Sequence, residues 1–444
     1  MINPPPEVSW EGKSWVGSAN DATLGFPLQS LPYCSFVSTS TPHATPHLGI
    51  GIGSFILDLY QLTKANLLTT LPADLQAACI APQLNPLMRC GPRAWSSLRQ
   101  RLFDLLKSID RTDRNTEQQR LVASLMLPMA RARFLKPVAV QNYTDFYASI
   151  HHATNVGRLF RPDQPLLPNY QWIPIGYNGR ASSLVISGTE ILRPRGQFKH
   201  PNDATPTFAP TTQLDYELEV AAYIGTGNTL GAPIPIAQAE HHLFGLSLLN
   251  DWSARDIQAW EAQPLGPFLG KSFATSISPW VIPMEALRRY RTPLASPHET
   301  LPYLAEISSG IDLTLEVLLS TPRMRAASFP PISLSKSNLR DLHWTFAQMI
   351  AHHTSNGCSL LEGDILATGT VSGPNPGAQG CLIEITQRGT QSIPLPNGET
   401  RTFLEDGDEI TLRGHCQREG LPTITFGECR GTILPSSSSV YFSV

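Results

Sequence analysis

Carboxylate side chains that could bind a cation occur at four places in the sequence. Glu217 and Glu219 lie two residues apart in a run with β-strand character, so both side chains point to one face. Asp251 follows the apolar run Leu246–Leu249, and Asp145 lies in a short acidic and aromatic segment. Like charges side by side are unfavourable without a cation between them. Oxygen ligands without cysteine suit Ca²⁺ or Mg²⁺ rather than Zn²⁺, whereas the alternative is a solvent-facing strand edge with ordinary exposed acids.

The stretch 250–275 combines an acid, basic residues and an amide with a tight turn rich in Pro and Gly. Ser253 and Asp256 have the spacing of a capping box, which predicts that a helix begins at Ser253. Arg255 and Gln258 are three residues apart and share one face of that helix. A strand end beside a helix start is typical of catalytic sites, but a surface helix with a solvated charged face fits the same pattern.

Six of the twelve histidines occur as three adjacent pairs, and one pair has a setting that suggests chemistry. The pairs 241–242 and 352–353 fall on predicted helices and lack the H-x-x-x-H spacing of metal ligands. His151 and His152 follow Asp145 within a few residues, and histidine ordinarily titrates near neutral pH. One of the two is therefore a candidate general base, although spacing does not say which. The sequence contains no G-x-S-x-G motif for a serine nucleophile.

The composition is that of a compact globular protein. The chain has 444 residues, of which 41% are hydrophobic and 16% charged, with a formal net charge of −3. Neither nucleic acid nor an anionic membrane is therefore an expected partner. Seven cysteines at wide spacings argue against a disulfide framework and favour a reducing compartment. Because no basic and apolar leader and no apolar run of about 20 residues is visible, we expect a cytoplasmic location.

Short strands between Gly, Pro and Asn residues predict a mainly β (α+β) protein. We expect two domains, 1–137 and 138–444, the second being a large sandwich or roll. Predicted helices cover 95–106, 117–134, 253–261 and 338–353, and predicted strands include 183–187, 215–223, 312–319, 381–385 and 409–412. The glycine-rich run 49–53 lacks the spacing of a dinucleotide-binding loop and alternates with period two, so it predicts a hairpin strand.

Several long blocks of the sequence match one family pattern with few interruptions. They are YTDFYASIHHATNVG (143–157), PIGYNGRASS (174–183), LDYELE (214–219), NDWSARDIQAWEAQPLGPFLGKSFAT (250–275), SKSNLRDLHWT (335–345), NGCSLLEGDILATGTVSGP (356–374) and FLEDGDEITLRGHC (403–416). Over nearly its full length, the chain resembles the fumarylacetoacetate hydrolase family. The resemblance implies an SH3-like N-terminal barrel in residues 1–137. It also implies a mixed β-sandwich roll in residues 138–444 that holds the active site, and a homodimer.

The resemblance implies a role for each candidate residue. The implied ligands of Ca²⁺ and/or Mg²⁺ are Asp145, Glu217, Glu219 and Asp251, with a second cation site at Asp251, Lys271 through its backbone, and Thr275. The implied catalytic residues are His152 as the base, Glu384 as its carboxylate partner, and Arg255, Gln258 and Lys271 as groups that stabilise charge. The implied substrate contacts are Tyr147, Arg161, Tyr177, Gln258 and Thr370.

The implied activity is metal-dependent hydrolysis of a carbon–carbon bond in a 1,3-diketo acid. 4-Fumarylacetoacetate and water would give fumarate and acetoacetate, the last step of phenylalanine and tyrosine catabolism through homogentisate. Two positions near the implied pocket depart from the family pattern: Ala262 replaces a tyrosine that touches substrate, and Asn178 replaces a histidine. The alternative is a paralogue that hydrolyses or decarboxylates a different acyl-keto acid in a specialised pathway.

Overall fold

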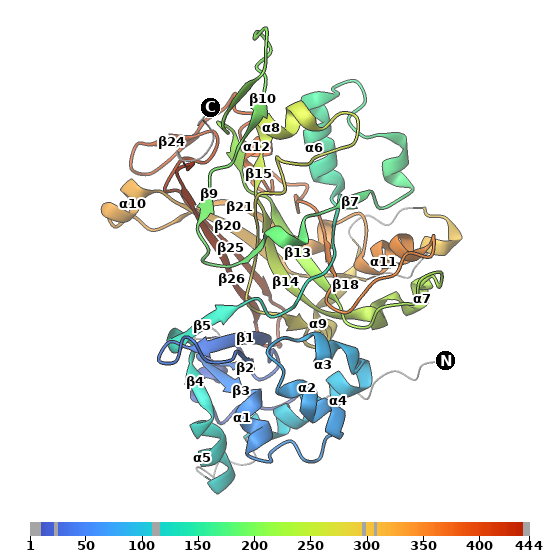
Figure 1. Ribbon diagram of the computed structural model, residues 1–444, viewed down its shortest axis with the longest axis vertical. Helices are drawn as coiled ribbons and strands as arrows, with labels where there is room; N and C mark the ends of the chain where they lie inside the picture. The colour runs from blue at the N-terminus through green and yellow to red at the C-terminus, as the bar shows by residue number, and fades with distance from the viewer. Residues whose placement is uncertain (1–9, 22–24, 109–115, 295–298, 306–308, 438–444) are drawn as a thin grey trace, which may run out of the picture.

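The computed structural model describes residues 10–21, 25–108, 116–294, 299–305 and 309–437. Figure 1 shows a smaller N-terminal unit, in blue, beneath a larger unit that carries most of the remaining chain. Both units are built on β-sheets with short helices around them, so the expected mainly β (α+β) class is confirmed. All seven cysteines are free, as their spacing predicts. Within the described ranges, no helix is long and apolar enough to cross a membrane.

A five-stranded antiparallel sheet forms the centre of the N-terminal unit. Its strands, in the order β4-β3-β2-β1-β5, are Met126–Pro128, Phe55–Asp58, His47–Ile52, Tyr33–Ser38 and Ala132–Leu135. The helices of this unit are α1 (Leu59–Lys64), α2 (Ala73–Cys79), α3 (Asn85–Arg89), α4 (Pro92–Leu106) and α5 (Glu117–Ser124). The run 49–53 forms most of β2 and the turn to β3, as predicted. A side chain at Gly49 would collide with Phe36 and Ile56, which explains a glycine inside this strand.

The larger unit contains two main sheets. The first has eight strands, and seven of them follow the order β7-β6-β22-β13-β14-β16-β8. In that order, they are Gly176–Asn178, Tyr143–Phe146, Ile365–Ala367, Leu218–Ile224, Leu243–Asp251, Thr275–Ile277 and Leu184–Ile186. The eighth strand, β17 (Ile282–Pro283), pairs with β14. The second has five strands in the order β21-β20-β25-β26-β9, which are Ile332–Asn338, Thr314–Ser320, Glu409–Cys416, Ile424–Leu434 and Ile191–Leu192.

Short ribbons and helices surround these two sheets. The ribbons are β12 (Leu214–Asp215) with β15 (Ser253–Ala254), β10 (Arg195–Phe198) with β11 (Thr207–Pro210), β18 (Arg291–Pro293) with β19 (Ser309–Ile311), and β23 (Ile393–Pro394) with β24 (Thr400–Arg401). The helices are α6 (Ile150–Phe160), α7 (Ile236–Ala239), α8 (Arg255–Glu261), α9 (Met284–Leu287), α10 (Pro322–Ala326), α11 (Phe346–Thr354) and α12 (Leu382–Ile385).

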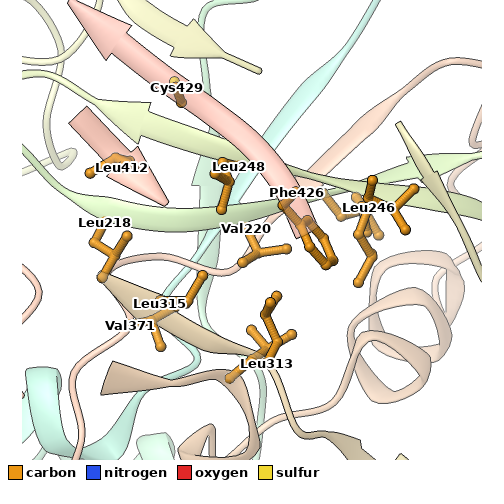
Figure 2. Packing of buried hydrophobic residues seen from close by; sticks show 14 of the residues in the cluster. Leu218, Val220, Leu246, Leu248, Leu313, Leu315, Val371, Leu412, Phe426 and Cys429 are labelled. Carbon is orange, nitrogen blue, oxygen red and sulfur yellow. The ribbon is translucent and has the colours of Figure 1, made fainter. Parts of the chain in front are cut away.

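The two main sheets of the larger unit pack against each other over a shared hydrophobic core. Figure 2 shows part of this core, in which Leu218, Val220 and Leu248 of the first sheet are buried with Leu315 and Phe426 of the second. Sheet-on-sheet packing buries alternate residues of each strand. The core therefore uses one face of the first sheet and leaves its opposite face for other contacts.

The opposite face of the first sheet carries every second residue of its central strands. In β13, Val220 and Ala222 face the core between the sheets, whereas Ala221 and Tyr223 join a second core with side chains of the N-terminal unit. The N-terminal unit thus covers part of this face. Glu219 has the parity of Ala221 and Tyr223, so its carboxylate belongs to the same face.

Two predicted helices are shorter than expected. The segment 117–134 is helical only as far as Ser124, because the residues that follow pair with β3 and β1 as strands β4 and β5. The helix predicted over 338–353 begins at Phe346, since Asn338 pairs with Thr314 in the second sheet. In both segments, sheet pairing overrides the helical periodicity of the sequence.

Two local predictions near the candidate site are wrong. The run 381–385 is the helix α12 and not a strand, because a short apolar run does not distinguish the two. The capping box at Ser253 does not form, since α8 begins at Arg255 with Ala254 at its N-cap. Ser253 instead belongs to the ribbon strand β15, and the carboxylate of Asp256 accepts hydrogen bonds from the segment 211–212.

Replacing Leu248 by Ala should lower the free energy of unfolding by about 2–5 kcal/mol, because this side chain is fully buried between the two sheets. The matched control is Leu265→Ala, since Leu265 is 97% exposed. It should change the free energy of unfolding by less than about 0.5 kcal/mol. Chemical denaturation followed by circular dichroism gives both values, and equal effects would contradict this placement of the core.

Candidate active site

The four carboxylates predicted as metal ligands converge on one face of the first sheet. Asp145, Glu217, Glu219 and Asp251 each offer an oxygen to a group whose ligand atoms all lie within 4.8 Å of one another. Glu219 pairs with Leu249 of β14, two residues before Asp251, and β22 joins β6 with Asp145 to the same sheet. All four residues are at most 5% exposed, so the alternative of an ordinary exposed strand edge is excluded.

Lys271 brings a positive charge into this carboxylate cluster. Its buried ammonium forms ion pairs with Glu217 and with Asp251, the latter at 2.7 Å between Nζ and Oδ2. Thr275, opposite Asp251 in β16, donates a hydrogen bond of 2.8 Å from Oγ1 to Oδ1 of Asp251. Burial alone would lower the pKa of Lys271, but Asp251 and Glu217 outweigh burial and raise it. The ammonium therefore stays charged at neutral pH.

The remaining carboxylate oxygens show whether the cluster fits a metal ion. Both oxygens of Glu219 and Oδ1 of Asp145 are buried and have no hydrogen-bond partner among the described residues. Burial raises the pKa of Asp145 well above its usual range, and the charge of Asp251 raises it further. Burial raises the pKa of Glu219 in the same way, with a further contribution from Asp145. A divalent cation would satisfy these atoms, and the all-oxygen donor set fits Ca²⁺ or Mg²⁺.

Arg255 approaches the cluster from the start of α8. Its Nη1 lies 2.8 Å from Oε1 of Glu217 and donates to Oε1 of Gln258 at 3.1 Å, so the two residues predicted to share a helix face are in contact. Its Nε donates to Oδ2 of Asp215 at 2.9 Å. Nη2 is buried and has no partner in the described part of the chain. Burial would raise the pKa of Glu217, but Lys271 and Arg255 hold it below its usual range.

His152 and Glu384 form a buried pair beside α6. Ser149 caps this helix by accepting the backbone N–H of His152, and Nδ1 of His152 lies 2.7 Å from Oε2 of Glu384. Burial would raise the pKa of Glu384, but the charge and hydrogen bond of His152 lower it to about 2. An ionised carboxylate only accepts, so Nδ1 donates to it, and Nε2 is the ring nitrogen that carries the lone pair when the imidazole is neutral. The structure pairs His152 with this carboxylate, whereas His151 is only half-buried.

Two predicted substrate contacts lie beside these groups. The ring of Tyr147 meets that of His152 edge-on, with 5.3 Å between centroids. Tyr177 lies opposite Asp145 in the pairing of β6 with β7, and burial together with the charge of Asp145 raises the pKa of its phenol well above the usual range. Both tyrosines therefore contact a residue of the candidate site directly.

Two further predicted substrate contacts, Thr370 and Arg161, differ in burial. Thr370, which follows β22, has a buried Oγ1 without a hydrogen-bond partner among the described residues. Arg161 is exposed at the end of α6 and donates from Nη2 to the carbonyl oxygen of Pro165 at 3.3 Å. The structure thus leaves Thr370 with a buried hydroxyl open to an acceptor and places Arg161 at the protein surface.

Glu384 has further partners that the sequence analysis did not identify. Its Oε1 accepts from Nδ2 of Asn155 at 2.9 Å, and Ser372 Oγ lies 3.0 and 2.8 Å from its two oxygens. Cys381 donates from Sγ to Oε2 at 3.0 Å. Asn155 is three residues beyond His152 on α6, which is a signal present in the sequence. Cys381 is three residues before Glu384, but the run 381–385 is predicted as a strand, in which that spacing places two side chains on opposite faces. Ser372 lies on another segment and gives no such signal.

Comparison with known proteins finds two family models that match this chain. The model described as fumarylacetoacetase N-terminal matches residues 29–137, and the model described as fumarylacetoacetate (FAA) hydrolase C-terminal matches residues 141–434. The fumarylacetoacetase of Arabidopsis thaliana is 45% identical over 428 residues, which are 96% of this chain and 99% of the relative. Those of Bos taurus and Homo sapiens are 44% and 43% identical, over 96% and 95% of this chain and 99% of each relative.

Glu219→Gln should abolish most of the stabilisation of the protein by divalent cations. In the wild type, Ca²⁺ or Mg²⁺ at about 100 times its Kd should add about 2.7 kcal/mol to the free energy of unfolding. The amide removes a charged ligand, but in metal-free protein it also removes a buried carboxylate without a partner. Metal-free E219Q should therefore be at least as stable as metal-free wild type.

Thermal unfolding with and without the cation measures both effects of this substitution. The control is Glu428→Gln, because Glu428 belongs to an exposed ion pair with Arg413. This control should keep the wild-type response to the cation. A response of E219Q equal to that of the wild type would contradict the assignment of the metal centre.

Proposed function

The chain belongs to the fumarylacetoacetate hydrolase family, and we propose that it hydrolyses 4-fumarylacetoacetate to fumarate and acetoacetate. Fumarylacetoacetases that are 43–45% identical over nearly the whole of both chains support this activity. The reaction is the last step of tyrosine catabolism through homogentisate. The observation that carries the proposal is a buried cluster of four carboxylates together with a buried pair of His152 and Glu384.

The proposed metal ligands are the four clustered carboxylates, Asp145, Glu217, Glu219 and Asp251. A Ca²⁺ or Mg²⁺ ion held there would supply a Lewis acid for the negative charge that develops on the diketone oxygens. Lys271 supports the site by offsetting the charge of Glu217 and Asp251. The proposed second cation site combines Asp251 with the backbone of Lys271 and with Thr275, whose hydroxyl donates a hydrogen bond to Asp251.

His152 is the proposed general base. Because Glu384 holds the proton on Nδ1, Nε2 is the atom that accepts a proton from water. The resulting hydroxide attacks a carbonyl carbon of the diketone, the carbon–carbon bond breaks, and its electron pair leaves with the acetoacetate carbon as an enolate. The proton held at Nε2 returns to that carbon, so the atoms of one water are divided between the two products. The ionised Glu384 stabilises the imidazolium while it holds the proton.

Three side chains are proposed to stabilise negative charge during the reaction: Lys271, Arg255 and Gln258. The buried Nη2 of Arg255, which has no acceptor within the described ranges, is a donor for the developing oxyanion. The proposed substrate contacts are Tyr147, Arg161, Tyr177, Gln258 and Thr370. The buried hydroxyl of Thr370 would gain a partner from a substrate oxygen, and the exposed charge of Arg161 suits a substrate carboxylate.

A paralogue that acts on a different acyl-keto acid is not favoured. Ala262 is half-buried at the C-terminal end of α8, and Asn178 is exposed on β7. Neither residue is among the groups proposed for the chemistry, so both departures leave the metal ligands and the base in place. Identity of 43–45% with fumarylacetoacetases over nearly the full length supports the parent reaction.

The proposal extends to domain structure and assembly. We take residues 1–137 as an SH3-like barrel domain and residues 138–444 as the catalytic β-sandwich roll, as the family resemblance implies. The protein acts on a small diketo acid as a homodimer in the cytoplasm, without nucleic acid or membrane as a partner. The formal net charge of −3 and the free cysteines support this setting.

Purified protein with Mg²⁺ or Ca²⁺ should hydrolyse 4-fumarylacetoacetate, measured as loss of the diketone absorbance, and EDTA should remove the activity. His152→Ala should lower kcat by about 10²–10⁴-fold, because it removes the proton acceptor. His151→Ala is the matched control and should leave kcat nearly unchanged. Absence of turnover by the metal-loaded wild type would contradict the proposed substrate. Equal losses of kcat in the two variants would contradict the role of His152 as the base.

A further inference from the structure

We propose that Asp215 is a positioning residue that joins the two halves of the active site. The inference rests on the proposed function, in which His152 with Glu384 moves a proton and Arg255 stabilises negative charge. Asp215 is not among the residues proposed to bind the metal, the substrate or the proton. Its role follows from what its carboxylate holds in place.

The Asp215 carboxylate is fully buried and accepts four hydrogen bonds. Oδ1 accepts from the backbone N–H groups of Tyr216 at 2.8 Å and Leu382 at 2.7 Å. Oδ2 accepts from the backbone N–H of Ile383 at 3.0 Å and from Nε of Arg255 at 2.9 Å. A buried carboxylate with two donors on each oxygen has a single well-defined orientation. The groups that it binds are therefore held at fixed positions relative to one another.

On one side, Asp215 determines where α12 begins. Leu382 and Ile383 are the first two residues of this helix, and Glu384 is the third. The N-cap residue of α12 makes no side-chain cap of its own, so Asp215 supplies the acceptor that the free backbone N–H groups need. A displacement of the helix start would move Glu384 and, with it, the ring of His152.

On the other side, Asp215 orients the guanidinium of Arg255. With Nε bonded to Asp215, Nη1 reaches Oε1 of Glu217 at 2.8 Å and the buried Nη2 stays without an acceptor among the described residues. A continuous path thus leads from Glu217 through Arg255, Asp215 and α12 to Glu384. The contact of Asp215 with Leu382 spans 167 positions in the sequence and links segments that carry different parts of the site.

A purely structural carboxylate offers a matched comparison. Asp408 is also fully buried, accepts from Nε and Nη2 of Arg401 at 2.9 and 3.1 Å, and accepts the backbone N–H of Glu405 at 2.9 Å. It binds no residue proposed for the active site in these contacts. Asp408→Asn therefore measures what the loss of a buried Asp–Arg pair does on its own.

Asp215→Asn keeps the side-chain volume but turns one acceptor into an amide donor that faces other donors. We expect kcat of D215N to fall about 10–100-fold with a smaller change in KM, because binding groups stay in place while the base and the arginine lose alignment. D408N should keep the wild-type kcat, even if it lowers the unfolding temperature as much as D215N does. Equal kcat in D215N and the wild type would overturn the proposal.

A double-mutant cycle with Glu384→Gln tests whether Asp215 acts through α12. In the E384Q background, D215N should lower kcat by a smaller factor than it does in the wild type, since the path to His152 is already broken. Fully multiplicative losses would overturn the proposal. Asp215→Glu keeps the charge but displaces it by one methylene, so it should retain more activity than D215N. If D215N does not fold, D215E is judged by the same criteria.

A crystal structure of D215N separates this test from the proposed function, because it requires no turnover. The distance between Nδ1 of His152 and the Glu384 carboxylate, 2.7 Å in the wild type, should exceed the hydrogen-bond limit of about 3.2 Å. An unchanged distance together with an unmoved Arg255 would overturn the inference. A wild type that is inactive on 4-fumarylacetoacetate would overturn the proposed function and leave this geometric test standing.

Discussion

The excess of buried negative over buried positive charge is the constraint on which the site depends. Asp145 and Glu219 share a cluster with Glu217 and Asp251, and the ammonium of Lys271 pairs with the last two only. Two like charges 4 Å apart repel by about 4 kcal/mol at an effective dielectric constant of 20. The cluster must therefore hold protons or a divalent cation. A divalent cation could also take up negative charge from a diketone.

The first sheet of the larger unit meets this constraint through the alternation of its strands. One face of β13 and β14 is committed to the core between the sheets, and the opposite face carries Glu219 and Asp251. Antiparallel pairing brings the start of β13 to the end of β14, where Thr275 of β16 also lies. The two-residue alternation of side chains that builds the core therefore also directs these carboxylates to the opposite face. The N-terminal unit covers part of the same face and adds to its burial.

The sequence predicts the members of the site better than the contacts that connect them. The spacing of Glu217 and Glu219 predicts a shared face, and the structure places both in the carboxylate cluster. Adjacent histidines cannot be told apart by spacing, and only the contact with Glu384 distinguishes His152. Spacing could not predict this contact, because His152 and Glu384 are 232 positions apart in the sequence. The short apolar run 381–385 also does not distinguish a strand from a helix. The individual roles of these residues come from the family resemblance and not from periodicity.

We expect the carboxylate cluster to exchange protons for a divalent cation. Burial raises the pKa of Asp145 and of Glu219 well above the usual range, which favours their protonated forms in the metal-free protein. Isothermal titration calorimetry of metal-free protein with Mg²⁺ or Ca²⁺, in buffers of different ionisation enthalpy, measures the protons released. We predict saturable binding with release of about one proton or more per ion near neutral pH. Binding without proton release, or no binding at all, would contradict this account.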